Sequence, residues 1–294
     1  METIDVLLPY YGDVDLMKTA VRSVAAQDDP HWRLIVIDDA YPDTEPAAWF
    51  ASLSDPRITY IRNEANLGAR GNFTKALDLA EAEVFVMMGA DDVMLPSYLR
   101  TVSAALRDHP GVSAVQPGVE VIDGSGRRVR TLPDAVKRLA GPKPRPVLVL
   151  GGEQLATSLL HAGWHYFPSL AWRTESVRRY GFSPEYNVVQ DLALLLDIAA
   201  DGGSVAVLRD PVFQYRRHAQ SDSSVRAVDG RRFIEERTFF HREAERFRSQ
   251  GWAQAARAAE LHWTSRLHAL SVLLRTARHP RRDTTRLLGQ HVLR

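Results

Sequence analysis

The chain has 294 residues, of which 45% are hydrophobic and 25% charged, as is typical of a globular protein with one large domain or two fused units. It contains no cysteine, which excludes disulfides, thiolate metal sites and cysteine nucleophiles. The net charge is +1. The N-terminus has acids before a short apolar run and no basic region, which is not the pattern of a signal peptide, and no stretch of the chain reaches the roughly 18 consecutive apolar residues of a membrane span. A cytoplasmic protein is therefore expected.

The first half of the sequence alternates short apolar segments with helical patterns. Strands are predicted at 4–11, 33–40, 58–64 and 83–89, and helices at 14–27, 45–53, 70–81 and 96–108. Residues 112–123 predict a further strand pair. Strands rich in Val and Ile that alternate with helices indicate right-handed crossovers and a mostly parallel central sheet flanked by helices, an α/β fold.

Polar pairs follow three of these strands: Tyr10–Tyr11, Asp38–Asp39 and Asp91–Asp92. Ligands of open α/β sheets bind at the carboxyl ends of the strands. Asp also favours turns, so chance turn chemistry is an alternative. Two acid pairs on one sheet favour a shared site, and such carboxylates can coordinate Mg²⁺ or Mn²⁺.

Several nucleotide-binding and phosphoryl-transfer motifs are missing. The sequence has no G-x-x-x-x-G-K-[ST], and the segment "GARGNF" at 68–73 lacks a complete G-x-G-x-x-G. Neither acid pair lies in a D-x-D-G-[TS]-like run. These absences argue against P-loop, dinucleotide-binding and aspartyl-phosphatase folds.

The second half continues with mixed elements. Residues 124–150, rich in Gly, Pro and Arg, predict a flexible loop that is either a lid or a linker. A strand running into a helix is predicted at 168–181, a helix at 188–203, and a strand or strand pair at 204–218.

Two long helical patterns follow at 229–250 and 252–278. The second has an apolar stripe, with Trp263 nearby, formed by Leu261, Leu267, Leu270 and Leu274. Residues 226–294 carry 15 Arg and 7 acids, a net charge of +8, whereas the preceding residues carry −7. Packing on the body or on a second copy is the default explanation; a solvated face, a partner and peripheral membrane contact are the alternatives.

Six segments, in this order, resemble glycosyltransferase family 2: "VLLPYYGDVDLMKTAVRSVAAQ", "WRLIVIDDAYPD", "NEANLGARGNFTKAL", "VMMGADDVMLPSYL", "YFPSLAWRTESVRRYGFSPEYNVVQDLALLLDIAADGG" and "YRRHAQSDSS". The resemblance covers about residues 3–225. It implies a GT-A fold with a nucleotide-sugar-binding half (1–123), an acceptor-binding half (124–225, with its loop at about 124–150) and a C-terminal helical extension (226–294).

The resemblance also implies an inverting, metal-dependent transfer of a hexose from a nucleotide-diphosphate sugar, with Mn²⁺ or Mg²⁺ as cofactor. The donor residues carried over are Pro9 and Tyr11 for the base pocket, Asp39 for a base N–H, Arg70 for the base or diphosphate, and Asp91 for the ribose. Uracil and thymine each offer an N–H that Asp39 could accept, so UDP- or dTDP-sugars are the favoured donors.

Asp92 and His218 are carried over as metal ligands, and Asp191 as the general base. The sequence departs from the family at Gly89, where many relatives have an acid, and at Gln190, which is assigned no role. A structural His218 and a helix-capping Asp191 are the alternatives.

Trp164, His165 and Tyr166 form an aromatic cluster that either binds the acceptor or belongs to core and rim. Arg outnumbers Lys by 33 to 4, a bias usual in high-GC genomes such as those of actinobacteria. Expected partners are therefore a cell-envelope glycan, a lipid-linked acceptor or a small natural product, and a second copy, but no nucleic acid. The alternatives are a non-catalytic binder of nucleotide-sugar or glycan, and an interaction protein that works through the basic C-terminal helices.

Overall fold

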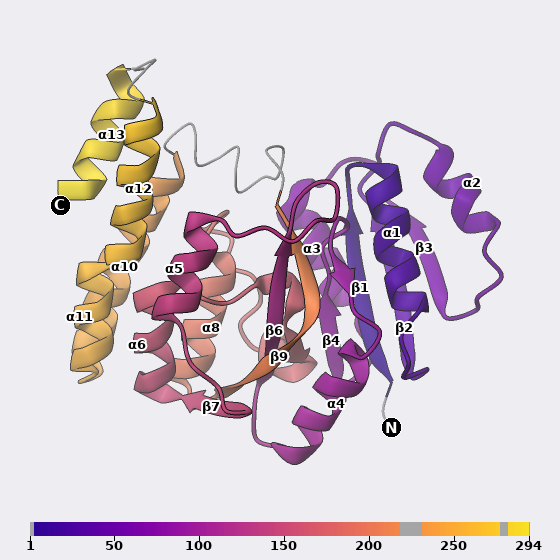
Figure 1. Cartoon of the computed structure of the whole chain (residues 1–294), viewed down its shortest axis with the longest axis horizontal. Helices are drawn as coiled ribbons and strands as arrows, with labels where there is room; N and C mark the ends of the chain where they lie inside the picture. The colour runs from indigo at the N-terminus through magenta and orange to yellow at the C-terminus, as the bar shows by residue number, and fades with distance from the viewer. Residues whose placement is uncertain (1–2, 218–230, 277–281, 294) are drawn as a thin grey trace.

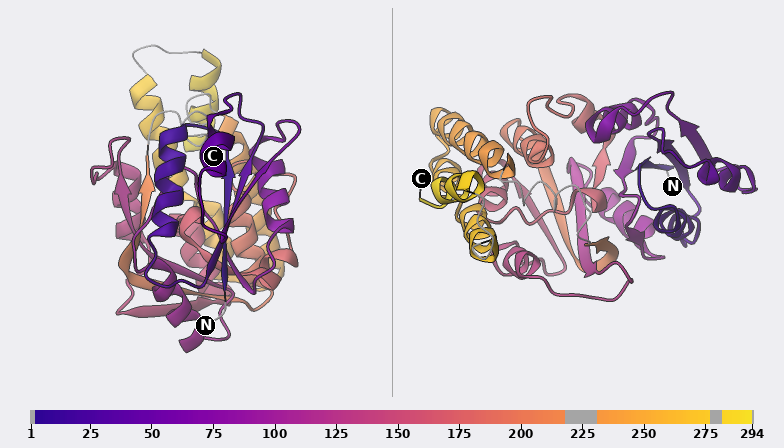
Figure 2. Two further views of the ribbon diagram at one scale, coloured as in Figure 1. Left: turned by 90° about the vertical axis from the view of Figure 1, so that its right-hand side faces the viewer. Right: turned by 90° about the horizontal axis from the view of Figure 1, so that it is seen from above.

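The computed structural model describes residues 3–217, 231–276 and 282–293. A central sheet carries helices on both faces, and helices from the C-terminal part stand at the end of the molecule opposite α2 (Figures 1 and 2). The strands are β1 (Ile4–Tyr10), β2 (Trp32–Asp38), β3 (Ile58–Arg62), β4 (Val84–Met87), β5 (Val93–Met94), β6 (Ala114–Ile122), β7 (Val147–Gly151), β8 (Ala171–Arg173) and β9 (Ser204–Arg216). The helices are α1 (Val14–Ala25), α2 (Glu45–Ala51), α3 (Gly68–Asp78), α4 (Tyr98–Asp108), α5 (Leu132–Ala140), α6 (Gly152–Ala162), α7 (Thr174–Arg178), α8 (Gln190–Ala200), α10 (Arg231–Ser249), α11 (Ala253–Leu261), α12 (Trp263–Thr276) and α13 (Arg282–Leu293).

The strands of the sheet follow the order β3-β2-β1-β4-β8-β6-β9-β5, and β7 pairs with β9. β1 is parallel to β2 and β4, and β2 to β3. β8 is antiparallel to both β4 and β6, so β6 and its parallel neighbour β9 run in the same direction as β4. The carboxyl ends of β1, β2, β4 and β9 therefore share one edge, and the predicted α/β fold is confirmed.

Alternate residues of the strands enter apolar clusters on opposite faces of the sheet. In β1, Val6 and Leu8 pack in the cluster that contains α1 and α4, whereas Leu7 packs in the cluster that contains α6 and α8. Burial on both faces explains why these strands consist of nearly continuous apolar residues.

Several segments differ from the sequence-based prediction. Residues 124–150 are not a continuous loop, because they contain α5 and most of β7. The strand pair predicted for 112–123 is wrong, because the single strand β6 occupies this segment, and of the two alternatives for 204–218 the structure has a single strand, β9. The helix predicted over 252–278 is interrupted at His262, whose positive φ of 25° separates α11 from α12. α6 and β5 have no counterpart among the predicted elements.

The C-terminal helices complete the main core. Phe239, Phe240 and Phe247 of α10 and the buried alanines of α11 belong to the same cluster as α6 and α8. On α12 and the end of α11, Leu267 and Leu261 of the predicted apolar stripe are 49% and 47% exposed. Among the described helices, none combines the length and apolarity that a bilayer crossing requires.

Candidate functional site

The first acid pair, at the carboxyl end of β2, has two different environments. Asp38 is fully buried and accepts hydrogen bonds from Tyr60 and Arg62 side chains, which makes it a structural residue. Asp39 accepts the side-chain amide of Asn63 and the backbone N–H of Leu67, each at 2.8 Å, and both bonds go to Oδ1. These bonds place Asp39 at the start of α3. The backbone N–H of Asp39 donates to the carbonyl of Tyr10 at 2.9 Å, so Asp39 also lies beside the end of β1.

Apolar side chains form an open shelf next to Asp39. Tyr11 is 57% exposed and Leu67 50% exposed. The Tyr41 ring lies edge-on to Tyr11 with centroids 5.4 Å apart, and Pro9 is half-buried in the strand below. A shelf of this kind beside a carboxylate suits a flat heteroaromatic ring that donates an N–H.

Arg70 lies in the first turn of α3. Its Nη1 donates to the carbonyl of Pro184 at 2.6 Å, so the guanidinium joins α3 to the segment that precedes α8. The residue is exposed. The structure thus ties the predicted donor-binding Arg70 to the second half of the chain.

The second acid pair, after β4, is held by the end of β9. The backbone N–H of Arg216 donates to Asp92 Oδ1 at 2.8 Å, and Arg216 Nε donates to the Asp91 carbonyl at 2.6 Å. Asp92 is 1% exposed, and its Oδ2 has no hydrogen-bond partner among the described residues. Burial, and then the charge of Asp91, raise the pKa of Asp92. A buried carboxylate oxygen without a partner is costly, so this atom is a candidate position for a bound group.

A side chain at position 89 would crowd the carboxylate of Asp92 in this arrangement. A Cβ added at Gly89 would lie 2.5 Å from Asp92 Oδ2 and 3.2 Å from Asp91 Oδ1. An acid at this position would displace the Asp92 carboxylate. Gly89 therefore makes room for Asp92 in addition to lacking a ligand of its own.

The fit to a divalent cation depends on Asp92. Within residues 3–217, 231–276 and 282–293, no group of three or more His, Asp or Glu side chains could hold a metal ion. His218, the second predicted ligand, lies outside the described residues. The unpartnered Asp92 oxygen nevertheless suits Mn²⁺ or Mg²⁺, which commonly take one or two carboxylates together with phosphate oxygens and water. The residues present fit a cation that is held jointly with a diphosphate.

Asp191, in the first turn of α8, pairs with His165. Asp191 Oδ2 lies 3.1 Å from His165 Nε2, and Oδ1 accepts the Leu192 N–H at 2.8 Å. Lys137 Nζ donates to the His165 carbonyl at 2.8 Å. Burial opposes the charge on Asp191, but His165, the Leu192 N–H and Lys137 outweigh it, so the pKa of Asp191 is lowered. With 26% of its side chain exposed, Asp191 is an accessible, ionised carboxylate suited to proton abstraction.

A chain of contacts connects the Asp92 region to the cavity side of the molecule. Burial, with the charges of Asp92 and Asp91, raises the pKa of Tyr215 to about 12. The Tyr215 and Tyr166 rings are 5.2 Å apart, and Tyr166 donates its O–H to Asp134 at 2.9 Å. Asp134 in turn accepts two hydrogen bonds from Arg217, at 2.7 and 2.8 Å.

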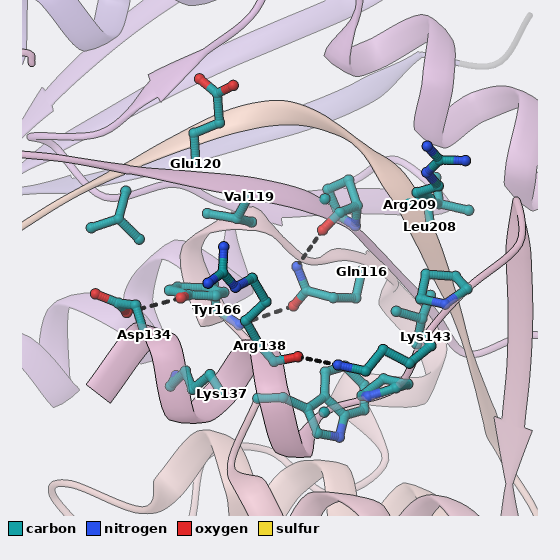
Figure 3. A pocket seen from close by; sticks show the side chains of 18 of the residues that line it. Gln116, Val119, Glu120, Asp134, Lys137, Arg138, Lys143, Tyr166, Leu208 and Arg209 are labelled. Carbon is teal, nitrogen blue, oxygen red and sulfur yellow. Dashed lines mark hydrogen bonds between the residues drawn. The ribbon is translucent and has the colours of Figure 1, made fainter. Parts of the chain in front are cut away.

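The predicted aromatic cluster divides into two parts. His165 contacts Asp191, whereas Trp164 and Tyr166 line a cavity of about 1180 Å³ between α5, β6 and β9 (Figure 3). Trp164 is only 6% exposed and donates its Nε1–H to Ser158 at 3.0 Å. It therefore belongs to the core as well as to the cavity wall.

Sequence reasoning missed several site residues. Tyr41 follows the first acid pair closely and could have been found from that position. Arg216 holds Asp92 from 124 residues away, a contact that no local sequence pattern indicates. Lys137 and Asp134 lie in the segment predicted as a loop, and no local pattern reveals contacts between such distant residues.

Comparison with known proteins finds a family and curated relatives that match parts of the sequence. The profile described as "Glycosyl transferase family 2" matches residues 5–156. WcaA of Escherichia coli, named for colanic acid biosynthesis, is 34% identical over 97 residues, which are 33% of this chain and 35% of WcaA. The GalNAc(5)-diNAcBac-PP-undecaprenol beta-1,3-glucosyltransferase of Campylobacter jejuni is 30% identical over 103 residues, 34% of this chain and 33% of the relative. The chain thus spans about a third of the length of these two curated relatives.

The likeness to solved structures covers the entire chain. TarS 1-349 of S. aureus in complex with UDP-GlcNAc has a TM-score of 0.64 at 15% identity and covers 99% of this chain and 90% of TarS 1-349. At this identity the likeness establishes the shared fold, including the C-terminal helices.

Proposed function

The chain belongs to glycosyl transferase family 2, and from this premise we propose that it transfers a sugar from a nucleoside-diphosphate donor to a hydroxyl group of a cell-envelope glycan. The observation that carries the proposal is the buried Asp92 carboxylate, whose Oδ2 has no partner among the described residues, at the same edge of the sheet as the open shelf of Tyr11 and Leu67 beside the buried Asp39. The names of WcaA and of the Campylobacter jejuni relative support a glycan, free or lipid-linked, over a small natural product.

The shelf would bind the nucleobase of the donor. Asp39 accepts through carboxylate oxygens, and uracil and thymine each offer an N–H to such an acceptor, so UDP- and dTDP-sugars are favoured. Tyr11 would cover one face of the base, since half of its ring surface is open. Asp91, adjacent to Asp92, would accept from the ribose hydroxyls.

Asp92 would hold Mn²⁺ or Mg²⁺ together with the donor diphosphate. When bound, the cation supplies positive charge where negative charge develops on the leaving diphosphate. Arg216 keeps the Asp92 carboxylate in place through its backbone N–H. The Arg216 guanidinium donates hydrogen bonds to the backbone carbonyls of Asp91 and Asp123, so it holds the segment that contains Asp91 and Asp92 in position.

Asp191 would act as the general base. It accepts the proton of the acceptor hydroxyl as that oxygen bonds to the anomeric carbon, while the bond between this carbon and the diphosphate oxygen breaks with its electron pair on the diphosphate. Attack from the face opposite the leaving group inverts the anomeric centre. His165 orients the carboxylate and, through the lowered pKa of Asp191, keeps it deprotonated before the reaction.

A donor screen tests this function. Purified protein is incubated with UDP-, dTDP- and GDP-sugars and Mn²⁺, and nucleotide release is followed over time together with the thermal shift. We expect a uridine or thymidine donor to raise the melting temperature and to release nucleotide when an acceptor is present. Nucleotide binding without any release on addition of envelope glycan acceptors would support the non-catalytic alternative instead.

A further inference from the structure

The cavity between α5, β6 and the start of β9 has no role in donor binding as proposed above. Its volume of about 1180 Å³ is larger than the roughly 300–1,000 Å³ usual for a small-molecule pocket. The strand side is apolar, with Val119, Val121 and Val207, and Tyr166 adds an aromatic ring. Figure 3 shows Arg138 extending from α5 toward the strand that carries Val119.

Positive charge dominates the lining of the cavity. Seven Lys and Arg residues line it, against two acids, Glu120 and Asp134. Glu120 is paired with Arg128 at 2.9 Å and Asp134 with Arg217 at 2.7 Å. Within the described part of the chain, no ion pair involves the remaining cavity arginines, Arg130, Arg138, Arg145 and Arg209. An excess of cations around an apolar floor fits a ligand with both an oxyanion and a carbon-rich body.

Two contacts connect the cavity wall to the proposed base. Lys137, which lines the cavity, donates to the carbonyl of His165, and His165 contacts Asp191. Lys137 Nζ also lies 4.4 Å from the centre of the Tyr166 ring. A molecule bound in the cavity would therefore contact Lys137, whose partner His165 contacts Asp191.

We propose that this cavity binds the acidic part of the acceptor, a phosphate, diphosphate or uronate carboxylate, and so selects anionic acceptors over neutral ones. This inference rests on the proposed glycosyl transfer, and it adds the charge class of the acceptor. The arginines without an ion pair among the described residues would bind the oxyanion, and the valine and tyrosine surface would contact the sugar or lipid portion. The rest of the acceptor would extend past Lys137 toward Asp191.

Binding is measured by calorimetry on the full chain saturated with UDP and Mn²⁺, so that the donor site is filled. The probes are inorganic diphosphate, an alkyl diphosphate-linked GlcNAc, tri-galacturonate and neutral octyl glucoside. We expect the acidic probes to bind at least about tenfold more tightly than octyl glucoside, with affinity that falls as ionic strength rises. The phosphate and uronate arms identify which oxyanion the acceptor carries.

The double variant Arg138→Gln/Arg145→Gln removes two exposed cavity charges, and Arg107→Gln/Arg257→Gln removes two exposed charges elsewhere. Because a hydrogen bond to a charged group contributes about 1.5–3 kcal/mol, the cavity variant should bind the acidic probes about tenfold or more weakly. The matched control should bind them as the unaltered chain does. Circular dichroism checks that both variants are folded.

Equal affinity for acidic and neutral probes, or equal losses in the cavity variant and its control, would overturn the inference. The proposed function fails separately. If no donor releases nucleotide, yet the acidic probes bind and depend on Arg138 and Arg145, the anion site stands while glycosyl transfer does not. If transfer occurs with no preference for acidic acceptors, the proposed glycosyl transfer stands and the anion site does not.

Discussion

At the residue scale, the half-buried carboxylate of Asp191 contacts the His165 ring through Oδ2 and accepts the Leu192 N–H through Oδ1. The pKa of Asp191 is lowered, since His165, the Leu192 N–H and Lys137 together outweigh the effect of burial. A group whose folded pKa lies below its ordinary value stabilises the fold at neutral pH and loses that contribution as pH falls through the folded pKa. Asp191 therefore stays ionised across the neutral range.

Asp191→Asn should lower kcat by about 10²–10⁴, because the amide cannot accept the acceptor's proton. The affinity for nucleotide should stay the same, since Asp191 lies away from the base shelf. Asp78→Asn, an exposed change on α3, is the matched control and should keep full activity. If Asp191→Asn released nucleotide at the same rate as the unaltered protein, Asp191 would not be the general base.

Gly89→Ala tests the space around Asp92. The added Cβ would lie 2.5 Å from Asp92 Oδ2, and relief of such overlap typically costs about 1–3 kcal/mol, so transfer should fall by about 5- to 150-fold. The concentration of Mn²⁺ needed for half-maximal activity should rise. Gly111→Ala, at a position with nothing within 4 Å, is the control. Unchanged Mn²⁺ dependence in Gly89→Ala would show that Asp92 does not hold the cation.

Lys137 predicts a pH dependence of anion binding. Burial, with Arg217, lowers the pKa of Lys137 to about 8, although Asp191 and Asp134 oppose the shift and Arg232 adds a smaller lowering. Below about pH 8 the ammonium is charged, so the affinity for tri-galacturonate or diphosphate probes should weaken as pH rises through that value. Because the pKa of Lys137 is about 8 in the folded chain and 10.5 ordinarily, Lys137 lowers the free energy of unfolding below about pH 8. This destabilising effect decreases as the pH rises from about 8 toward 10.5.

Calorimetric titrations of the acidic probes check this dependence. They are run between pH 6.5 and pH 9.5 at constant ionic strength, and the Kd values at different pH are compared to within an order of magnitude. In Lys137→Gln the profile should be flat over this interval. A profile that stays as steep in the variant would assign the titration to another group.

At the scale of elements, α10 determines where α8 begins. Glu235 Oε1 accepts the backbone N–H groups of Asn187, Val188 and Val189 at 3.0, 2.7 and 3.1 Å. Arg246 of the same helix pairs with Asp197 of α8 at 2.6 Å. The C-terminal helices thus anchor the helix that carries Asp191, which gives them a direct part in the site.

Glu235→Ala should lower kcat several-fold with little change in the KM for donor, because loss of the three hydrogen bonds loosens the start of α8 by about 1–3 kcal/mol. Glu245→Ala, exposed on the same helix, serves as the control. A change confined to donor KM would show that Glu235 acts elsewhere than on α8.

The elements that sequence patterns predict well are those with a strong local signal. Val- and Ile-rich strands such as β1 and β2, and the amphipathic helices between them, are specified by their own residues, and the strand-end rule then places Asp39 and Asp92 correctly. Two-residue β5 is too short for a periodic signal. α6, α5 and Glu235 depend on packing and hydrogen bonds with distant segments, which no local pattern contains.

At the scale of the whole molecule, the two halves of the chain share one sheet. β8, from the second half, lies between β4 and β6 of the first half and pairs with both. Its Trp172 is fully buried. The region matched by the family profile, residues 5–156, therefore lacks a central strand of its own sheet.

A fragment of residues 1–156 should not fold into a nucleotide-binding unit, because removal of β8 exposes the edges of β4 and β6. We expect aggregation and no binding of UDP by calorimetry, in contrast to the full chain. A monomeric fragment that binds UDP with the affinity of the full chain would show that β8 is dispensable for the donor half.

The position of β8 also sets an order for biosynthesis. As the chain leaves the ribosome, β1 to β4 and then β6 emerge before Arg173, so the growing sheet has a gap at its centre until that residue is free. Unpaired strand edges in nascent chains promote aggregation, and domains are completed only when their last strand arrives. Production of this protein should accordingly benefit from chaperones that cover the strand edges of β4 and β6 until β8 has emerged.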